Sequence, residues 1–125
     1  MGSTISLTCA DGTSIPAYVA TPVATPRGGL VLLQEIFGVN THIRAVADSY
    51  AADGYLVVAP AMFHRVQASV ELGYSPDDVA GGVALKARTE ALPPPGPLQE
   101  VQAAVDAARS AGKVAVMGYC WGGWL

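Results

Sequence analysis

The sequence has few charged residues and no cluster of basic ones. Charged side chains make up 14% of the 125 residues, and ten acidic against seven basic ones give a net charge of −3. Proteins that bind nucleic acid or anionic membrane surfaces usually carry a basic patch. The composition therefore argues against both roles, and we expect no nucleic-acid partner and no membrane partner.

Long hydrophobic runs are also missing. The longest, such as residues 30–33 and 55–62, fall far short of the roughly 20 apolar residues that a membrane-spanning helix needs. The N-terminus lacks the charged segment and apolar core of a signal peptide. Cys9 and Cys120 are the only cysteines and have neither a C-x-x-C nor a metal-ligand spacing. We therefore expect a cytoplasmic protein with free thiols and no metal site.

Glycine loops that bind phosphate groups are absent as well. Neither G-x-G-x-x-G nor G-x-x-x-x-G-K-[ST] occurs, so no nucleotide cofactor is expected. Apolar residues, by contrast, are abundant and make up 51% of the chain. This is enough for a hydrophobic core, and the length allows one domain. We expect a single domain over residues 1–125.

The hydrophobic pattern predicts a hairpin followed by buried strands. Residues 3–8 and 14–19 read as two strands around the turn residues Asp11 and Gly12. Residues 21–29 have the proline and glycine content of a loop. Three apolar runs of strand length then follow, at residues 30–34, 55–60 and 113–118.

Helices are predicted between these strands. Residues 43–51 place apolar side chains on one helical face, and Pro97 opens a second amphipathic helix over residues 98–111. A weaker helix is expected after Ser75, because two glycines lower its helix propensity. Parallel strands joined by right-handed helical crossovers form an open α/β sheet. We therefore expect an α/β fold with a mostly parallel sheet and an N-terminal antiparallel hairpin.

The last predicted strand runs directly into residues 118–123, GYCWGG. This segment matches the G-x-nucleophile-x-G elbow of α/β-hydrolases, with cysteine as the nucleophile. Gly118, Gly122 and Gly123 would let strand and helix approach closely, so that Cys120 projects at the carboxyl edge of the sheet. The N–H groups of the following helix would favour a thiolate there. The alternative is a buried structural cysteine in a glycine-rich turn.

A second motif, residues 34–38 (QEIFG), follows the first buried strand. The carboxyl edge of an open α/β sheet is where ligands bind. Glu35 is therefore a candidate for a partly desolvated functional carboxylate, and the alternative is a solvated carboxylate in a surface loop. The backbone N–H groups of Ile36 and Trp121 are candidate donors to an oxyanion.

Taken together, residues 33–40 (LQEIFGVN) and 118–123 resemble the signatures of the dienelactone hydrolase family of α/β-hydrolases. The resemblance implies an α/β-hydrolase-type sheet and hydrolysis of a small-molecule ester or lactone without a cofactor. By motif match, Cys120 would be the acylated nucleophile, and Glu35 would contact the resting thiol. The N–H groups of Ile36 and Trp121 would form the oxyanion hole.

The chain also departs from the family pattern. The family's triad Asp and His follow the nucleophile, whereas five residues follow Cys120 here, so we expect an incomplete triad and a sheet incomplete after the elbow. His42 and His64 precede Cys120 and are expected to be surface or structural residues, with a local base role for His64 as the alternative. Arg65 and Arg88 fall in the segment where dienelactone-cleaving members hold a carboxylate, but the match assigns neither.

An incomplete sheet suggests two further expectations. The outer edge of the last strand would be apolar and unpaired, a template for a second polypeptide or for self-association. The chain could then be a catalytically incomplete hydrolase fragment that acts as an assembly or interaction module. A thiol redox sensor is a weaker alternative, because no second cysteine lies near Cys120 in sequence.

Overall fold

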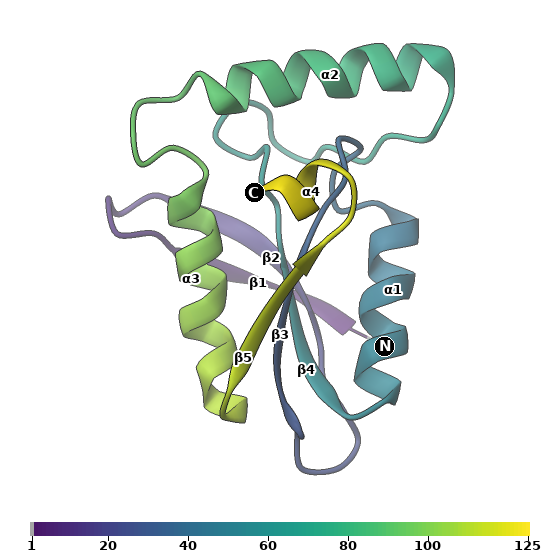
Figure 1. The fold of residues 1–125 in the computed structure, drawn as a ribbon, viewed down its shortest axis with the longest axis vertical. Helices are drawn as coiled ribbons and strands as arrows, with labels where there is room; N and C mark the ends of the chain where they lie inside the picture. The colour runs from purple at the N-terminus through teal and green to yellow at the C-terminus, as the bar shows by residue number, and fades with distance from the viewer. Residues whose placement is uncertain (1) are drawn as a thin grey trace.

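Residues 2–125, described by a computed structural model, form one five-stranded sheet with helices on both faces (Figure 1). The strands are β1 (Gly2–Thr8), β2 (Ser14–Ala20), β3 (Gly28–Leu33), β4 (Tyr55–Pro60) and β5 (Val114–Gly118). The helices are α1 (Thr41–Ala52), α2 (Pro76–Glu90), α3 (Leu98–Ala108) and α4 (Trp121–Trp124), with a 3₁₀ turn at Arg109–Ala111.

The strand order across the sheet is β1-β2-β4-β3-β5. β3 is parallel to both β4 and β5, whereas β1 and β2 form an antiparallel hairpin that joins the sheet at β4. The predicted open α/β sheet with an N-terminal hairpin is confirmed. β3 is the central parallel strand, so its carboxyl end lies between those of β4 and β5.

Two hydrophobic clusters cover the two faces of the sheet. On one face, Val31 and Leu33 of β3 share a cluster with small residues of α3, including Ala104. On the other face, Leu30 and Leu32 share a cluster with residues of α1. Alternate residues of a strand point to opposite faces, so β3 is buried on both sides, as its continuous apolar run predicts.

The start of β3 differs from the sequence-based expectation. Gly28 and Gly29 were expected in a loop but form the first two residues of the strand. A β-carbon on Gly29 would lie 2.5 Å from the backbone oxygen of Ala108. Glycine is therefore needed here because the end of α3 packs directly on the strand backbone, and no loop is involved.

Helix α2 is longer and better capped than its composition suggests. The Ser75 side chain accepts from the Asp78 N–H, and the Asp78 carboxylate accepts from the Ser75 N–H, which makes a capping box. A β-carbon on Gly82 would lie 2.4 Å from the backbone oxygen of Ile36. The glycine that weakens the helix locally thus allows α2 to pack against the loop after β3. In Figure 1, α2 crosses the end of the molecule where β3 and β5 finish.

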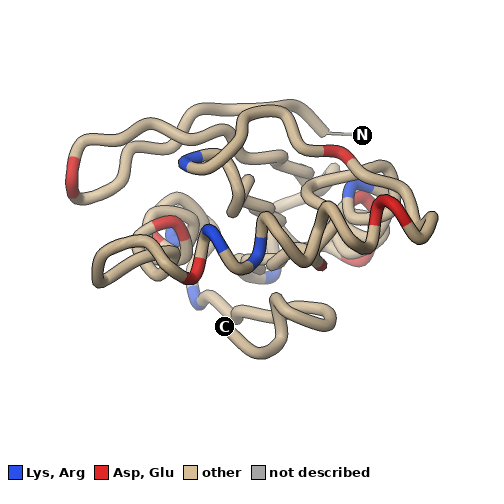
Figure 2. The backbone as a smooth tube through the Cα atoms, turned by 90° about the horizontal axis from the view of Figure 1, so that it is seen from above, with Lys and Arg blue, Asp and Glu red and all other residues tan. Residues whose placement is uncertain are grey.

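Basic and acidic positions are interspersed over several elements (Figure 2). α2 itself carries Asp77 and Asp78 in its first turn and Arg88 in its last, the arrangement that suits a helix dipole. None of the helices within residues 2–125 combines the length and hydrophobicity that a bilayer-spanning segment requires.

Candidate active site

Cys120 occupies a tight turn between β5 and α4. Its backbone has φ 54° and ψ −117°, a conformation that few residues other than glycine adopt, and its side chain is exposed. Non-glycine residues held at positive φ cluster at functional sites. The turn thus holds the Cys120 side chain in solvent at the carboxyl end of the sheet.

The glycines around Cys120 are required by close backbone contacts. A β-carbon on Gly118 would lie 2.2 Å from the carbonyl carbon of Gly122, and one on Gly122 would lie 2.5 Å from the backbone oxygen of Leu33. Gly123 is tight as well, at 3.0 Å from the oxygen of Gly118. These contacts pack α4 onto both β5 and the end of β3, so larger residues would force the turn to open.

The strand register brings Cys120 and Glu35 to the same level of the sheet. Leu33 pairs with Gly118 in the parallel β3–β5 ladder, and Glu35 and Cys120 each lie two positions beyond this pair. The Tyr119 N–H donates to the Leu33 oxygen and extends the pairing beyond the strands. Residues 85 apart in the chain therefore leave adjacent strand ends together.

The Glu35 side chain is half-buried and is held by a tyrosine. The Tyr74 hydroxyl donates to Glu35 Oε1 at 2.8 Å, and the Asn40 amide donates to the same hydroxyl at 3.3 Å. Burial raises the pKa of Tyr74, the bond from Asn40 lowers it, and the Glu35 carboxylate raises it again. Among residues 2–125, Glu35 and Cys120 share no hydrogen bond.

Sequence reasoning missed Tyr74. It lies 39 residues after Glu35, in the loop before α2, and its ring packs edge-on against Phe37 at 4.5 Å. Asn40 connects the two loops because its Oδ1 caps α1 while its Nδ2 donates to the Leu72 oxygen. An Asn before an amphipathic helix predicts the cap, but no sequence pattern predicts the contact with Tyr74.

The two candidate oxyanion donors lie at this edge of the sheet, shortly after β3 and β5 end. Ile36 follows Glu35, and Trp121 follows Cys120 as the first residue of α4. Neither backbone N–H has a hydrogen-bond acceptor within the described chain. The Trp121 side chain is buried and stacks on Phe63 at 5.1 Å, which fixes the position of its backbone.

Within residues 2–125, neither histidine forms a hydrogen bond with Cys120. His42 is exposed on the first turn of α1, with its ring 6.4 Å from that of Tyr74. His64 lies in the loop after β4, and its buried Nδ1 has no partner within residues 2–125. In the same described part of the chain, no group of three or more His, Cys, Asp or Glu residues is arranged to hold a metal ion.

The two arginines considered for substrate binding differ sharply. Arg88 is exposed in the last turn of α2. Arg65 is bound from several directions, because its guanidinium pairs with Glu100 and with Asp11 at 2.7 Å and donates to the Thr13 hydroxyl at 3.1 Å. These ion pairs hold the pKa of Arg65 above its usual value and that of Asp11 well below it.

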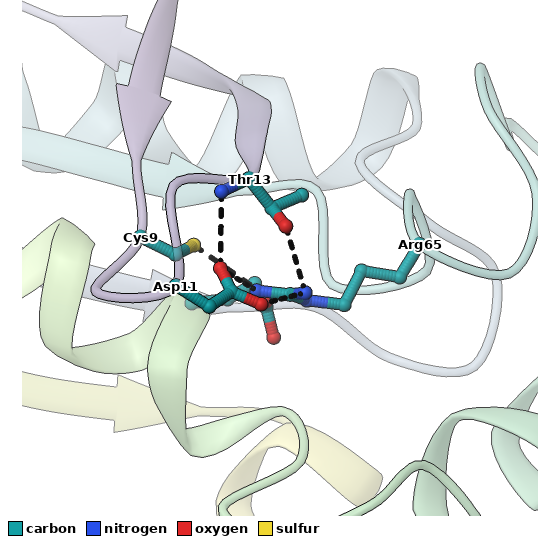
Figure 3. Close-up of polar contacts among 5 residues, drawn as sticks. Cys9, Asp11, Thr13 and Arg65 are labelled. Carbon is teal, nitrogen blue, oxygen red and sulfur yellow. Dashed lines mark hydrogen bonds and ion pairs between the residues drawn. The ribbon is translucent and has the colours of Figure 1, made fainter.

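The second cysteine belongs to the Arg65 cluster. Figure 3 shows the side chains of Cys9, Asp11 and Thr13 converging on the Arg65 guanidinium. The Cys9 thiol is 4% exposed and donates to Glu100 Oε1 at 3.6 Å. Burial, followed by the negative charge of Glu100, raises the pKa of Cys9. The cluster joins the β1–β2 hairpin to the loop after β4 and to α3.

A model of the dienelactone hydrolase family matches residues 15–125. The chain belongs to the dienelactone hydrolase family. It is 36% identical over 117 residues to a Synechocystis protein named "Putative carboxymethylenebutenolidase", covering 89% of this chain and 46% of that protein. It is 32% identical over 125 residues to the carboxymethylenebutenolidase of Pseudomonas putida, covering 97% of this chain and 52% of that protein.

Solved structures agree on the fold. The crystal structure of a Klebsiella pneumoniae protein described as a "Putative Dienelactone Hydrolase" superposes with a TM-score of 0.69 at 24% identity, over 97% of this chain and 51% of that chain. At this identity the likeness shows the α/β-hydrolase fold alone. The chain spans about half the length of the curated relatives it matches.

Proposed function

We propose that this protein hydrolyses a small ester or lactone with Cys120 as the nucleophile. The observation that carries the proposal is the conformation of Cys120, which is exposed at positive φ in a turn bounded by three glycines at the end of β5. The family match and the carboxymethylenebutenolidase name of the Pseudomonas relative support the same reaction class.

The proposed chemistry starts with attack of the Cys120 thiolate on the substrate carbonyl carbon. An Sγ–C bond forms, and the carbonyl oxygen becomes an oxyanion that accepts from the N–H groups of Ile36 and Trp121. Collapse of this intermediate breaks the C–O bond, and the alkoxide takes up the proton that the Cys120 thiol has lost; an ester then releases its alcohol, whereas an opened lactone keeps the hydroxyl on the acyl group. Water then attacks the thioester, which releases the carboxylic acid and returns the thiol.

Glu35 has a defined place in this proposal. It leaves β3 at the level of Cys120, and Tyr74 holds its carboxylate through a hydrogen bond. As the family resemblance implies, Glu35 would contact the Cys120 thiol before substrate binds, and this contact would form when the carboxylate leaves Tyr74, because the structure has no hydrogen bond between Glu35 and Cys120 within residues 2–125. Tyr74 would be a positioning residue, because it acts on the thiol only through Glu35.

Thioester trapping tests the proposal. The purified protein is mixed with p-nitrophenyl acetate, stopped in acid, and analysed by intact mass and peptide mapping. We expect one acetyl group on the peptide that contains Cys120, its loss in Cys120→Ala, and its retention in Cys9→Ala. Acetylation elsewhere that persists in Cys120→Ala would overturn the assignment.

The edge of β5 supports a further part of the proposal, that another polypeptide segment or a second copy pairs there. Within residues 2–125, β5 pairs only with β3, and Val116 is 49% exposed. An unpaired apolar edge strand favours association. Sedimentation of the 125-residue polypeptide is expected to show association that Val116→Lys reduces. A monomer at high concentration would contradict this part.

A further inference from the structure

Helix α2 carries an exposed apolar stripe, which consists of Val79 and Val83. These side chains are 41% and 52% exposed, and their i, i+4 spacing places them on one face of the helix. Tyr74, shortly before the helix, is 54% exposed. Residues 79–85 include no charged side chain, and in Figure 2 this uncharged stretch separates the acidic first turn of α2 from its basic positions. Neighbouring exposed apolar side chains are typical of a binding surface.

Contacts at the end of β3 place α2 beside the turn that holds Cys120. A β-carbon on Gly122, two residues after Cys120, would lie 2.6 Å from the Gln34 oxygen, and one on Gly82 of α2 would lie 2.4 Å from the Ile36 oxygen. Gln34 and Ile36 are two residues apart, which is at most about 7 Å of extended chain. The Cys120 turn and α2 therefore pack on neighbouring residues of the same segment.

The packing of α2 shows which side of the helix stays open. Leu85, three residues after Gly82, is buried and belongs to the core cluster. At about 3.6 residues per turn, Val79 and Val83 lie on the other side of Gly82 around the helix. Since Gly82 marks the contact with Ile36, the surface that leads from this contact to solvent is the apolar stripe.

The charges around the stripe disfavour an anionic ligand. Arg88 follows Val79 by nine residues, about two and a half turns at roughly 3.6 residues per turn, so it lies on the opposite side of α2. Lys86 already pairs with Glu90 at 2.9 Å. An anionic group beside the stripe would have to compete with Glu90 for this cation and would lie near the Glu35 carboxylate. An uncharged apolar group fits these surroundings better.

We propose that the apolar stripe is part of the substrate site, so that the ester or lactone is uncharged and places an apolar group against α2. This inference rests on the proposed hydrolase function and deepens it by naming the substrate class. Ile36 would donate to the oxyanion through its N–H, and it meets α2 through its oxygen. A group attached to the substrate carbonyl is therefore within reach of Val79 and Val83.

Alkylation of Cys120 tests the stripe without requiring ester hydrolysis. The probes are iodoacetamide, which is small and uncharged, N-benzyl iodoacetamide, which adds an apolar ring, and iodoacetate, which is anionic. Peptide mapping of the native full chain gives each rate at Cys120, and division by the rate of the same probe with N-acetylcysteine corrects for intrinsic reactivity. We expect the corrected rate of the N-benzyl probe to exceed that of iodoacetamide by about 10-fold, since burying one methylene group is worth about 4-fold. Iodoacetate should be the slowest.

Charged substitutions test the location. Val79→Asp and Val83→Asp should each lower the advantage of the N-benzyl probe to about 3-fold or less. Val83→Arg should raise the corrected rate of iodoacetate by about 5-fold, the usual size of an interaction between charges near the surface. The same substitutions at Val23, which is fully exposed in the loop before β3, are the matched controls and should leave all rates as in wild type. Circular dichroism reports folding, and Val83→Thr, which keeps the side-chain shape but adds a hydroxyl, replaces a variant that fails to fold and should lower the same advantage.

Two results would overturn the proposal. One is equal corrected rates of the two uncharged probes in wild type, and the other is the same ratio of these rates in Val83→Asp and Val23→Asp. If that ratio is unchanged while Val83→Asp associates less in sedimentation, the stripe is instead a contact between copies of the chain. The hydrolase proposal fails separately, because absence of Cys120 acetylation by p-nitrophenyl acetate refutes that function and leaves the alkylation ratios unaffected.

Discussion

The two cysteines of this protein lie in opposite surroundings. Cys9 is buried, and its thiol donates to a carboxylate that Arg65 neutralises. Cys120 is exposed at positive φ in a turn that close glycine contacts define. The first environment disfavours a thiolate by burial and negative charge, whereas the second presents the sulfur to solvent at a sheet edge. The difference shows that the surroundings, and not the residue type, separate a structural thiol from a candidate nucleophile.

The regions also differ in how they are stabilised. Around Cys9, charged side chains form ion pairs, in which the 1% exposed Glu100 pairs with Arg65 through Oε1, while its buried Oε2 has no partner within residues 2–125. Around Cys120, close contacts between backbone atoms stabilise the turn, because α4 packs on the ends of β3 and β5. A buried ion pair is costly to break, whereas a strained turn is sensitive to added volume. Each region should therefore respond to a different kind of substitution.

The largest expected effect comes from breaking the buried charge cluster. Arg65→Ala leaves the Glu100 carboxylate buried without a cation, and we expect a loss of about 3–5 kcal/mol in the free energy of unfolding, measured by urea denaturation. Lys86→Ala, which removes an exposed pair with Glu90, is the control and should cost less than about 1 kcal/mol. A loss below that of the control would show that the cluster is not structural.

Alkylation should separate the two thiols by rate. Cys9 reacts only after local opening, and an opening free energy of about 3 kcal/mol slows its labelling roughly 100-fold relative to Cys120. Iodoacetamide labelling of the native protein with peptide mapping measures both rates, and labelling in urea should remove the difference. Faster modification of Cys9 in the folded protein would reverse the comparison.

Neighbouring glycines on α2 allow a sharper test of backbone packing at the candidate site. Gly82→Ala places a β-carbon 2.4 Å from the Ile36 oxygen, and we expect a loss of about 1–3 kcal/mol together with reduced acylation of Cys120. Gly81→Ala meets nothing closer than 3.9 Å and should stabilise the helix by up to about 1 kcal/mol. Thermal unfolding of both variants checks this, and equal effects would contradict the close contact.

The Asp11–Arg65 pair predicts a dependence of stability on pH. Because Arg65 lowers the pKa of Asp11 in the folded protein, the contribution of the pair is present above the unfolded pKa of about 3.9. It is lost as the pH falls through the folded value. The free energy of unfolding of Asp11→Asn should therefore fall less steeply than that of wild type as the pH is lowered below about 4. If the free energy of unfolding falls equally steeply in Asp11→Asn and wild type, the pair does not contribute to stability in this way.

The smallest expected effect concerns Glu35. Our proposal places the Glu35 carboxylate beside the Cys120 thiol, where its negative charge disfavours thiolate. Glu35→Gln should therefore speed alkylation of Cys120 near neutral pH by about 2- to 5-fold, because charges near the surface interact by about 1 kcal/mol. Tyr74→Phe is the comparison variant, because it keeps the Glu35 carboxylate but removes the hydrogen bond that Tyr74 donates to it. An unchanged pH profile in Glu35→Gln would make Glu35 a simple loop carboxylate.

The sequence alone determined the order of elements and the candidate residues. Apolar runs and helical periodicity depend on neighbouring residues, so they predicted the hairpin, β4, α1 and the start of α3 closely. Local motifs likewise pointed to Cys120 and Glu35, because the glycines of a tight turn and a carboxylate after a buried strand are visible in a few consecutive letters.

Only the tertiary structure decided how distant segments use these residues. By local propensity, Gly29 disfavours a strand and Gly82 disfavours a helix. In the fold, however, each allows a helix to pack against the backbone of a segment distant in sequence. The family resemblance left Arg65 unassigned, and only the structure shows that it pairs with Asp11 and Glu100. The contact of Tyr74 with Glu35 carried no sequence signal. Contacts between residues far apart in sequence depend on the packing of whole elements, which no local pattern encodes.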